Sequence, residues 1–346
     1  MAFRKMVRVV LLACLLQVSL QTTIVIDSGS GLVKAGFAVP GDSEPQAVVP
    51  DVCGRPNDGS NSNEWLYFGQ EALDTPGVII DYPCQLGFAE LEEPLAQVWD
   101  YTCKEVLNVG TPGDKVVITM SPKASDSSIA AMKSLVKTYL GSATVESVST
   151  AEACLKNVGI QTALVVESGH SVTQATAFKD GVMIGQTVLT EIGGQDVSEA
   201  LASLMGLRSG ATQETDTIKE AICYVAEDFT NEMARRTNFN TPTGDRIVLT
   251  DEIFRAPEIL FSYQGWGPAK EYDPIQNLIV KAISSAPADL KADLYSNIIL
   301  SGGNTMFPGF VQRLAKEIEA IAADGQSFQL IAPPNRKFGA WVGATK

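Results

Sequence analysis

Histidine is almost absent from this sequence: His170 is the single one among 346 residues. One imidazole rules out His-rich zinc sites, HExxH helices and most paired histidine acid-base catalysts. The six cysteines lie at wide, irregular spacings without a CxxC pair, so neither a zinc site nor a disulfide framework is expected. Any chemistry should therefore depend on carboxylates, hydroxyls, amides and lysines.

Basic residues are also scarce, with 26 Lys and Arg against 40 Asp and Glu, a formal net charge of −14. A chain with this charge is repelled by nucleic acids and anionic membranes, so we expect no nucleic acid partner. Its 45% of hydrophobic and 19% of charged residues exclude a disordered chain. The length is enough for two domains with a large buried core.

No apolar run is long enough to span a bilayer, and the run at residues 9–16 is a short one. It follows the basic residues Arg4, Lys5 and Arg8, an arrangement typical of a secretory signal. A short N-terminal helix or a misassigned start is the alternative, and the sequence leaves both open. We therefore predict residues 1–21 as an N-terminal extension of a cytoplasmic protein, or of a secreted one if the extension acts as a signal.

The most informative positive feature is an internal repeat. Residues 22–37 consist of a strand-like run, an acidic residue, a Ser-Gly turn and a second strand-like run, and residues 162–178 repeat this order. Each copy predicts a β-hairpin whose loop begins with a carboxylate, Asp27 in the first and Glu167 in the second.

Helical periodicity appears between and after the hairpins, at residues 91–107, 125–140, 216–229 and 310–323. Strands that alternate with helices indicate an α/β protein with partly parallel sheets. Because the hairpin occurs twice, we predict two duplicated domains with a cleft between them.

The first hairpin loop has the composition of a phosphate-binding site. Gly29 and Gly31 let backbone N–H groups approach an anion, and the side chains of Ser30 and Lys34 add donors. Asp27 and its counterpart in the second hairpin are suited to hold Mg²⁺ through water. The alternative is that these are ordinary turn residues, but the repetition of the pattern favours nucleotide phosphates.

A third glycine-rich loop, residues 300–309, lies between an apolar strand and the last predicted helix. Gly302 and Gly303 let the backbone pack flat against a ring or a phosphate, and Met306 and Phe307 offer apolar surface to a base. The alternative is a tight strand-to-helix turn.

With these three loops the chain resembles actin and the actin-related proteins, members of a larger ribonuclease H-like superfamily that includes the Hsp70 chaperones and sugar kinases. The resemblance runs from about residue 22 to the C-terminus. It is carried by the hairpins and by short stretches that have no catalytic reason to match. These stretches are residues 54–56, 67–72, 219–220, 223–226, 254–258, 291–295, 301–306, 332–337 and Trp341.

The resemblance implies two actin-like α/β domains, residues 22–156 with 337–346 and residues 157–336, and a cleft that binds ATP or ADP with Mg²⁺ or Ca²⁺. It implies Asp27 and Glu167 as catalytic acids that also hold the metal through water. The residues it implies in nucleotide binding are Ser28, Gly29, Ser30, Gly31, Lys34, Ser168, Gly169, His170, Lys219, Glu220, Gly302, Gly303, Met306, Phe307 and Lys337.

Several positions depart from the family pattern near the attacking water. The glutamine that positions this water in actin aligns with Thr150, which is too short to reach it. The family's aspartate, following acid, glycine and histidine are replaced by Glu167, His170, Ser171 and Gln174. Loss of one positioned polar group costs about 10²-fold or more in rate, so we expect nucleotide binding with weak or absent hydrolysis. The alternative is that Gln174 orients the water instead.

Assembly is affected by two further departures. The family loop that inserts into the next subunit has an apolar tip, whereas residues 57–64 here are shorter and polar. The chain also stops soon after Trp341, where the family continues into C-terminal helices, and residues 7–16 are a candidate to cover the apolar surface left behind. We therefore expect impaired polymerisation.

These features predict an actin-like cytoskeletal protein that responds to nucleotide and acts through contacts with other proteins, among them actin or actin-binding proteins. At most it would be a slow ATP phosphohydrolase. One alternative is a slow ATPase that forms filaments as actin does, and another is a scaffold without nucleotide. A kinase of the same superfamily would need a further base carboxylate in the cleft, and the sequence offers none outside the hairpins.

Overall fold

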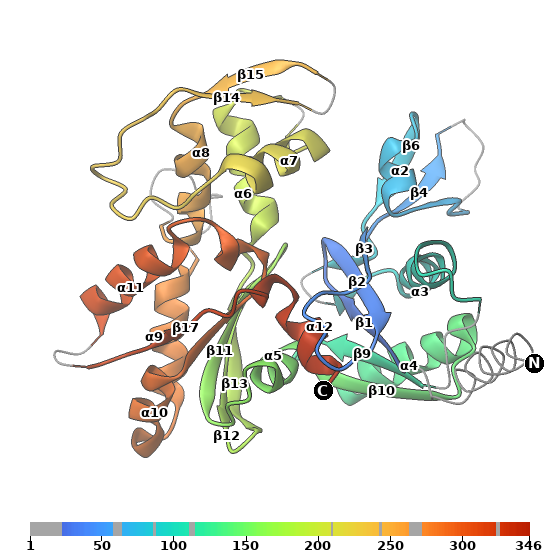
Figure 1. The fold of residues 1–346 in the computed structure, drawn as a ribbon, viewed down its shortest axis with the longest axis horizontal. Helices are drawn as coiled ribbons and strands as arrows, with labels where there is room; N and C mark the ends of the chain where they lie inside the picture. Colours follow the sequence, from blue (N-terminus) through green and yellow to red (C-terminus); the bar gives the residue numbers. More distant parts are fainter. Residues whose placement is uncertain are drawn as a thin grey trace, which may run out of the picture.

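Two five-stranded sheets organise the protein, one in each half of the chain. The computed structural model describes residues 23–57, 64–85, 88–110, 115–208, 210–241, 244–262, 272–322 and 326–346. Figure 1 shows the two sheets in separate lobes. Within these ranges no helix has the length and apolar character that crossing a membrane requires. The predicted extension at 1–21, including its apolar run, lies outside the described residues.

The first sheet consists of β1 (Thr23–Ser28), β2 (Leu32–Phe37), β3 (Ala47–Pro50), β9 (Lys115–Met120) and β10 (Thr144–Ser149). Its strand order is β10-β9-β1-β2-β3. The three strands nearest the N-terminus pair antiparallel, and β1, β9 and β10 pair parallel. Ile24, Ile26 and Val33 are buried in its core, and Val25 is buried on the opposite face against Trp341 of α12, so β1 is covered on both faces.

The second sheet consists of β11 (Ala163–Ser168), β12 (Thr173–Lys179), β13 (Val182–Thr190), β16 (Ile298–Ser301) and β17 (Leu330–Ile331). Its strand order is β13-β12-β11-β16-β17. Here too the first three strands pair antiparallel and the last two are parallel to β11. The order and direction of all five strands match the first sheet, which confirms the predicted α/β duplication.

Helices cover the sheets, and three of the four predicted ones form as expected. They are α3 (Glu92–Tyr101), which continues as a π-helical turn to Val106, α4 (Asp126–Leu140) and α11 (Phe310–Ile321). Ser125 caps α4, since its Oγ accepts a hydrogen bond from Ser128 N at 3.1 Å. The other elements are β4 (Cys53–Pro56), β5 (Tyr67–Phe68), α2 (Gln70–Asp74), β6 (Val78–Asp81), β7 (Cys84–Gln85), β8 (Phe88–Ala89), α5 (Thr150–Val158), α6 (Gly194–Leu204), α7 (Gln213–Ile222), β14 (Thr237–Asn240), β15 (Arg246–Leu249), α8 (Glu252–Arg255), α9 (Ile275–Ser285), α10 (Lys291–Ser296), α12 (Gly339–Ala344) and short 3₁₀ turns.

The helix predicted over residues 216–229 is wrong at its C-terminal half, because α7 ends at Ile222. The next backbone is extended and bonds to distant segments: Tyr224 N donates to Ile253 O at 3.1 Å, and Val225 N donates to Pro308 O at 2.8 Å. Val225 is buried, so its place in the apolar pattern reflects core packing rather than a helix. Residues 54–56, one of the stretches that carry the resemblance, belong to β4, which pairs with β6.

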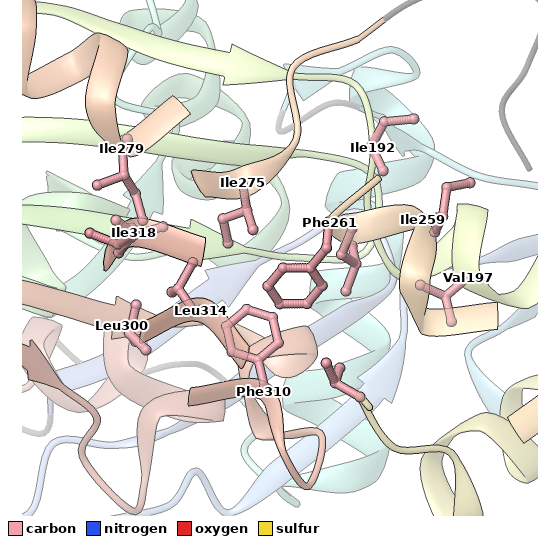
Figure 2. Close-up of a cluster of buried hydrophobic side chains, with 14 of the residues drawn as sticks. Ile192, Val197, Ile259, Phe261, Ile275, Ile279, Leu300, Phe310, Leu314 and Ile318 are labelled. Carbon is pink, nitrogen blue, oxygen red and sulfur yellow. The ribbon is translucent and has the colours of Figure 1, made fainter. Parts of the chain in front are cut away.

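The largest apolar core lies around the second sheet (Figure 2). The rings of Phe261 and Phe310 lie 5.2 Å apart between centroids, at an interplanar angle of 60°. Arg313 lies with its guanidinium carbon 5.1 Å from the centroid of Phe261 and bonds both oxygens of Glu258, at 2.7 and 2.8 Å. This buried ion pair fixes α11 against the 3₁₀ turn at Ala256–Leu260.

The chain crosses between the two sheets at two adjacent helices. α5 leads from β10 of the first sheet to β11 of the second, and α12 packs against α5, β1 and β9. Trp341 Nε1 donates to Val25 O at 3.1 Å, and the Trp341 side chain is fully buried. A Cβ atom on Gly343 would lie 1.6 Å from Ala153 O, so only glycine allows α12 to approach α5 this closely.

Candidate functional site

The loop of the first hairpin presents its carboxylate at the end of β1. Asp27 lies opposite Lys34 in the register of β1 and β2, and Lys34 Nζ donates to its Oδ2 at 2.9 Å. Thr119 Oγ1, at the end of the parallel strand β9, donates to the other oxygen at 2.6 Å. The turn is closed by Gly29 N, which donates to Leu32 O at 3.1 Å. Asp27 is therefore buried with a partner on each oxygen.

The second hairpin repeats this arrangement with different side chains. Glu167 lies opposite Gln174, as Asp27 lies opposite Lys34, and Gln174 Nε2 donates to Glu167 Oε2 at 2.9 Å. Thr150 Oγ1, on the first residue of α5, donates to the same oxygen at 3.1 Å. Burial raises the pKa of Glu167 to about 7; these two hydrogen bonds oppose the rise, and the charge of Asp27 adds to it.

The third glycine loop packs directly on the second hairpin. Gly302 has a φ of 91°, and a Cβ atom there would lie 2.2 Å from Ser168 O. Asn304 Nδ2 donates to Ser168 Oγ at 3.0 Å and to Gly169 O at 2.7 Å. Sequence reasoning missed Asn304, because only glycine and apolar residues were considered in this loop. A buried amide in a glycine-rich loop is a polar signal that would have identified it.

The residues expected near the base divide into two groups. Lys337 Nζ lies 3.6 Å from Glu220 Oε2, so the structure brings this pair together beside the 3₁₀ turn at Arg336–Phe338. Lys219 points its ammonium group at α6, where it donates to Gly194 O at 3.1 Å and to Ser198 Oγ at 2.7 Å. It also donates to Asp216 Oδ1, on its own helix α7, at 2.7 Å.

The two apolar residues of the third loop differ in exposure. Met306 is 39% exposed, whereas Phe307 is partly buried and packs against the apolar core around the second sheet. Only Met306 of these two presents substantial surface to a base.

A pocket of about 300 Å³ lies where the two hairpin loops meet. Both halves of the chain contribute to it, as expected for a cleft between two domains. It is lined by Ser30, Tyr82, Cys84, Gln85, His170, Ser171, Glu191, Gln195, Asp196 and Glu199. Of the predicted site residues, Ser30 and His170 line this pocket. The sequence did not predict Tyr82, or the lining residues that follow β13 and lie on α6, because nothing in the local sequence marks them.

His170 has a depressed pKa, because burial and the nearby charge of Lys219 disfavour its protonated form. Asp216 and Glu220 oppose this shift. The imidazole is thus held toward the neutral form in which one ring nitrogen donates and the other accepts.

Behind the first hairpin lies Asp51, a residue that sequence reasoning did not select. Its backbone N donates to Gly31 O at 3.1 Å, and its side chain is fully buried. Neither carboxylate oxygen has a hydrogen-bond partner among the described residues. Burial raises the pKa of Asp51 to about 8, although the charge of Lys34 opposes the rise.

The donor set fits a hydrated divalent cation rather than one bound directly by the protein. In the described part of the chain no three His, Cys, Asp or Glu side chains gather into a metal-binding cluster. Asp27 and Glu167 contribute one carboxylate from each hairpin, and their charges interact. Two such carboxylates are suited to hold Mg²⁺ or Ca²⁺ through water when phosphate oxygens supply the inner ligands.

Two sheets of matching strand order, with a pocket where their hairpin loops meet, are the arrangement expected of an actin-like α/β fold. A sequence model of the actin family matches residues 19–212 and 209–346. An actin-like protein of Neurospora crassa is 31% identical over 350 residues, which cover 93% of this chain and 90% of that protein. The chain belongs to the actin family.

Proposed function

We propose that this chain is an actin-like cytoskeletal protein that binds Mg·ATP or Mg·ADP in the pocket between its domains. The observation that carries the proposal is the matched pair of hairpins, with Asp27 and Glu167 at the same register position and both loops at one pocket. The loop backbones and Lys34 would bind the phosphates, with the base near Met306, Glu220 and Lys337. A bound Mg²⁺ would neutralise phosphate charge, and Asp27 and Glu167 would hold its water ligands.

Weak or absent hydrolysis is the second part of the proposal. Thr150 and Gln174 are the side chains nearest in position to the family's water-orienting groups, and both donate to Glu167 Oε2. Donors bound to the carboxylate are not free to orient a water molecule, and one missing orienting group costs about 10²-fold in rate.

The competing candidate is a slow ATPase that forms filaments as actin does. One observation favours the ATP hydrolysis in this alternative. The pKa of Glu167 is raised to about 7, which suits a general base at neutral pH. Phosphate release from Mg·ATP, followed over hours, distinguishes weak or absent hydrolysis from a slow ATPase. A rate equal to that of conventional actin would contradict weak hydrolysis.

Impaired polymerisation is supported by the composition of residues 57–64, which are polar or glycine throughout and offer no apolar tip to a neighbouring subunit. Because the chain belongs to the actin family, we also propose that it contacts actin or actin-binding proteins and that it is located in the cytoplasm and cytoskeleton. Sedimentation at raised salt and Mg²⁺ tests assembly: we expect the protein in the supernatant, and a pelleted polymer would contradict the proposal.

Nucleotide binding is tested most directly by thermal unfolding with and without Mg·ATP. A ligand at 100 times its Kd stabilises the folded state by about 2.7 kcal/mol, so a clear rise in Tm is expected. Lys34→Gln should reduce this rise, because the phosphate donor is lost, and the exposed Lys137→Gln should not. No rise at saturating nucleotide would favour the scaffold without nucleotide.

A further inference from the structure

The two hairpin loops touch each other directly across the pocket. Ser171 Oγ donates to Ser30 Oγ at 2.7 Å, a bond between residues 141 positions apart in the chain. The His170 ring lies against Gly31, where a Cβ atom would be 2.7 Å from its Cγ and 2.9 Å from its Nδ1. The second loop therefore contacts the first through two successive side chains.

The backbone of the second loop is fixed on its own side. Gly194 N donates to Gly169 O at 2.9 Å, and Gln195 N donates to His170 O at 2.7 Å, so the first turn of α6 binds the loop. A Cβ atom on Gly193 would lie 2.4 Å from His170 O, so the backbone before α6 packs directly against the loop. The interdomain contact can open only by side-chain rotation or by movement of the domains.

A phosphate oxygen that lies between donors of the two loops needs those donors apart. It would lie about 2.8 Å from each hydroxyl oxygen, so the two hydroxyl oxygens would be about 4 Å or more from each other. The 2.7 Å contact between the Ser30 and Ser171 hydroxyls is shorter than this separation. A phosphate oxygen cannot enter between these two hydroxyls, and Ser171 cannot donate to a phosphate, until the contact has been broken.

We infer that Ser171 and His170 form an interdomain latch that selects nucleoside diphosphate over nucleoside triphosphate. The inference rests on the proposed nucleotide function, with the base at the third glycine loop and the terminal phosphate, farthest from the base, between the hairpin loops. ADP leaves the latch closed, whereas ATP must open it and loses affinity by the free energy of the contact. Ser171 and His170 are thus specificity-determining residues of this chain.

The test compares the affinities of Mg·ADP and Mg·ATP, measured by calorimetry, for the wild type and Ser171→Ala. We expect the wild type to bind Mg·ADP at least as tightly as Mg·ATP. A single hydroxyl contact corresponds to about a five- to tenfold change in affinity. Ser171→Ala should therefore bind Mg·ATP about five- to tenfold more tightly and leave the affinity for Mg·ADP within twofold. His170→Ala/Ser171→Ala should extend the gain.

The matched control is Ser127→Ala, which removes a hydroxyl that makes a similar 2.9 Å contact with Ser125 on the surface of α4. It should change neither affinity. Equal shifts for both nucleotides in Ser171→Ala, or no shift, would overturn the latch while leaving nucleotide binding intact. If neither nucleotide binds the wild type, the proposed function itself fails and the latch fails with it.

Discussion

Gln174 donates to Glu167 across the second hairpin at the register position where Lys34 donates to Asp27 across the first. The duplicated hairpins thus place a neutral amide in one domain where the other has a cation. Burial raises the pKa of Glu167 to about 7, and the hydrogen bond from Gln174 opposes this rise without cancelling it. The two equivalent hairpins therefore hold their carboxylates in different electrostatic surroundings, one beside a cation and one beside an amide.

Thr150→Gln should raise the rate of phosphate release from Mg·ATP by about tenfold or more. The longer amide reaches beyond Glu167 and restores a group that can orient water, which is worth about 10²-fold in rate when well placed. Single-turnover phosphate release measures the change. Thr150→Val is the matched control, because it removes the bond to Glu167 without adding a donor; an equal gain in this variant would contradict the explanation.

Asp51→Asn should stabilise the protein, and more so as the pH rises. The pKa of Asp51 is about 8 in the folded chain against an ordinary value of about 4, so the unfolded chain releases its proton first. Unfolding of the wild type should therefore become easier from about pH 4 to pH 8, by up to about 1.4 kcal/mol per pH unit from this group, and no further above pH 8.

Urea unfolding of Asp51→Asn at pH 5, 6.5 and 8 measures this slope. At pH 7 the variant should be about 2–4 kcal/mol more stable than the wild type. The exposed Asp289→Asn should keep the wild-type slope. A difference between wild type and Asp51→Asn that does not grow with pH would show that Asp51 is not a buried, unpartnered acid.

Arg313→Met should destabilise the second domain by about 3–5 kcal/mol, because it leaves Glu258 buried without its cation. The double variant Glu258→Leu/Arg313→Met removes both charges and should recover most of the loss. Chemical denaturation of the three proteins gives the coupling energy. If the double variant is no more stable than Arg313→Met, the cost comes from lost packing on Phe261 rather than from the charge.

Gly343→Ala should destabilise the protein by about 1–3 kcal/mol or more, because the new methyl group overlaps Ala153 O and α12 has to move away from α5. Gly110→Ala is the control, since no atom lies within 4 Å of a Cβ at that position. Thermal unfolding compares the two. Equal melting temperatures would mean that the two helices separate at little cost.

The hairpins and their carboxylates could be predicted from the sequence because the contacts that define them are local. Asp27 and Lys34 are seven positions apart, and strand alternation alone places them opposite each other. Thr119 could not be paired with Asp27 in this way, because a parallel strand 92 positions away brings it there. The end of α7 was missed for a similar reason: backbone bonds to Ile253 and Pro308 determine it, not its own side chains.

The direction of the Lys219 side chain also depends on long-range packing. The resemblance implied a contact with nucleotide, but the ammonium group binds oxygens at the start of α6. Likewise, Asp51 lies in an ordinary turn sequence, and only the packed structure shows that its carboxylate has no partner. Sequence patterns report the type of element, whereas the environment of a charge depends on every segment around it.

The side-by-side crossings of α5 and α12 restrict how the two halves of the molecule can move. The two halves are joined through two helices that pack on each other, and this packing resists their separation. Thr150 is the first residue of α5, so this connection begins at the hydroxyl that binds Glu167. A movement of the domains that displaced α5 would change the surroundings of that carboxylate, and with them its pKa.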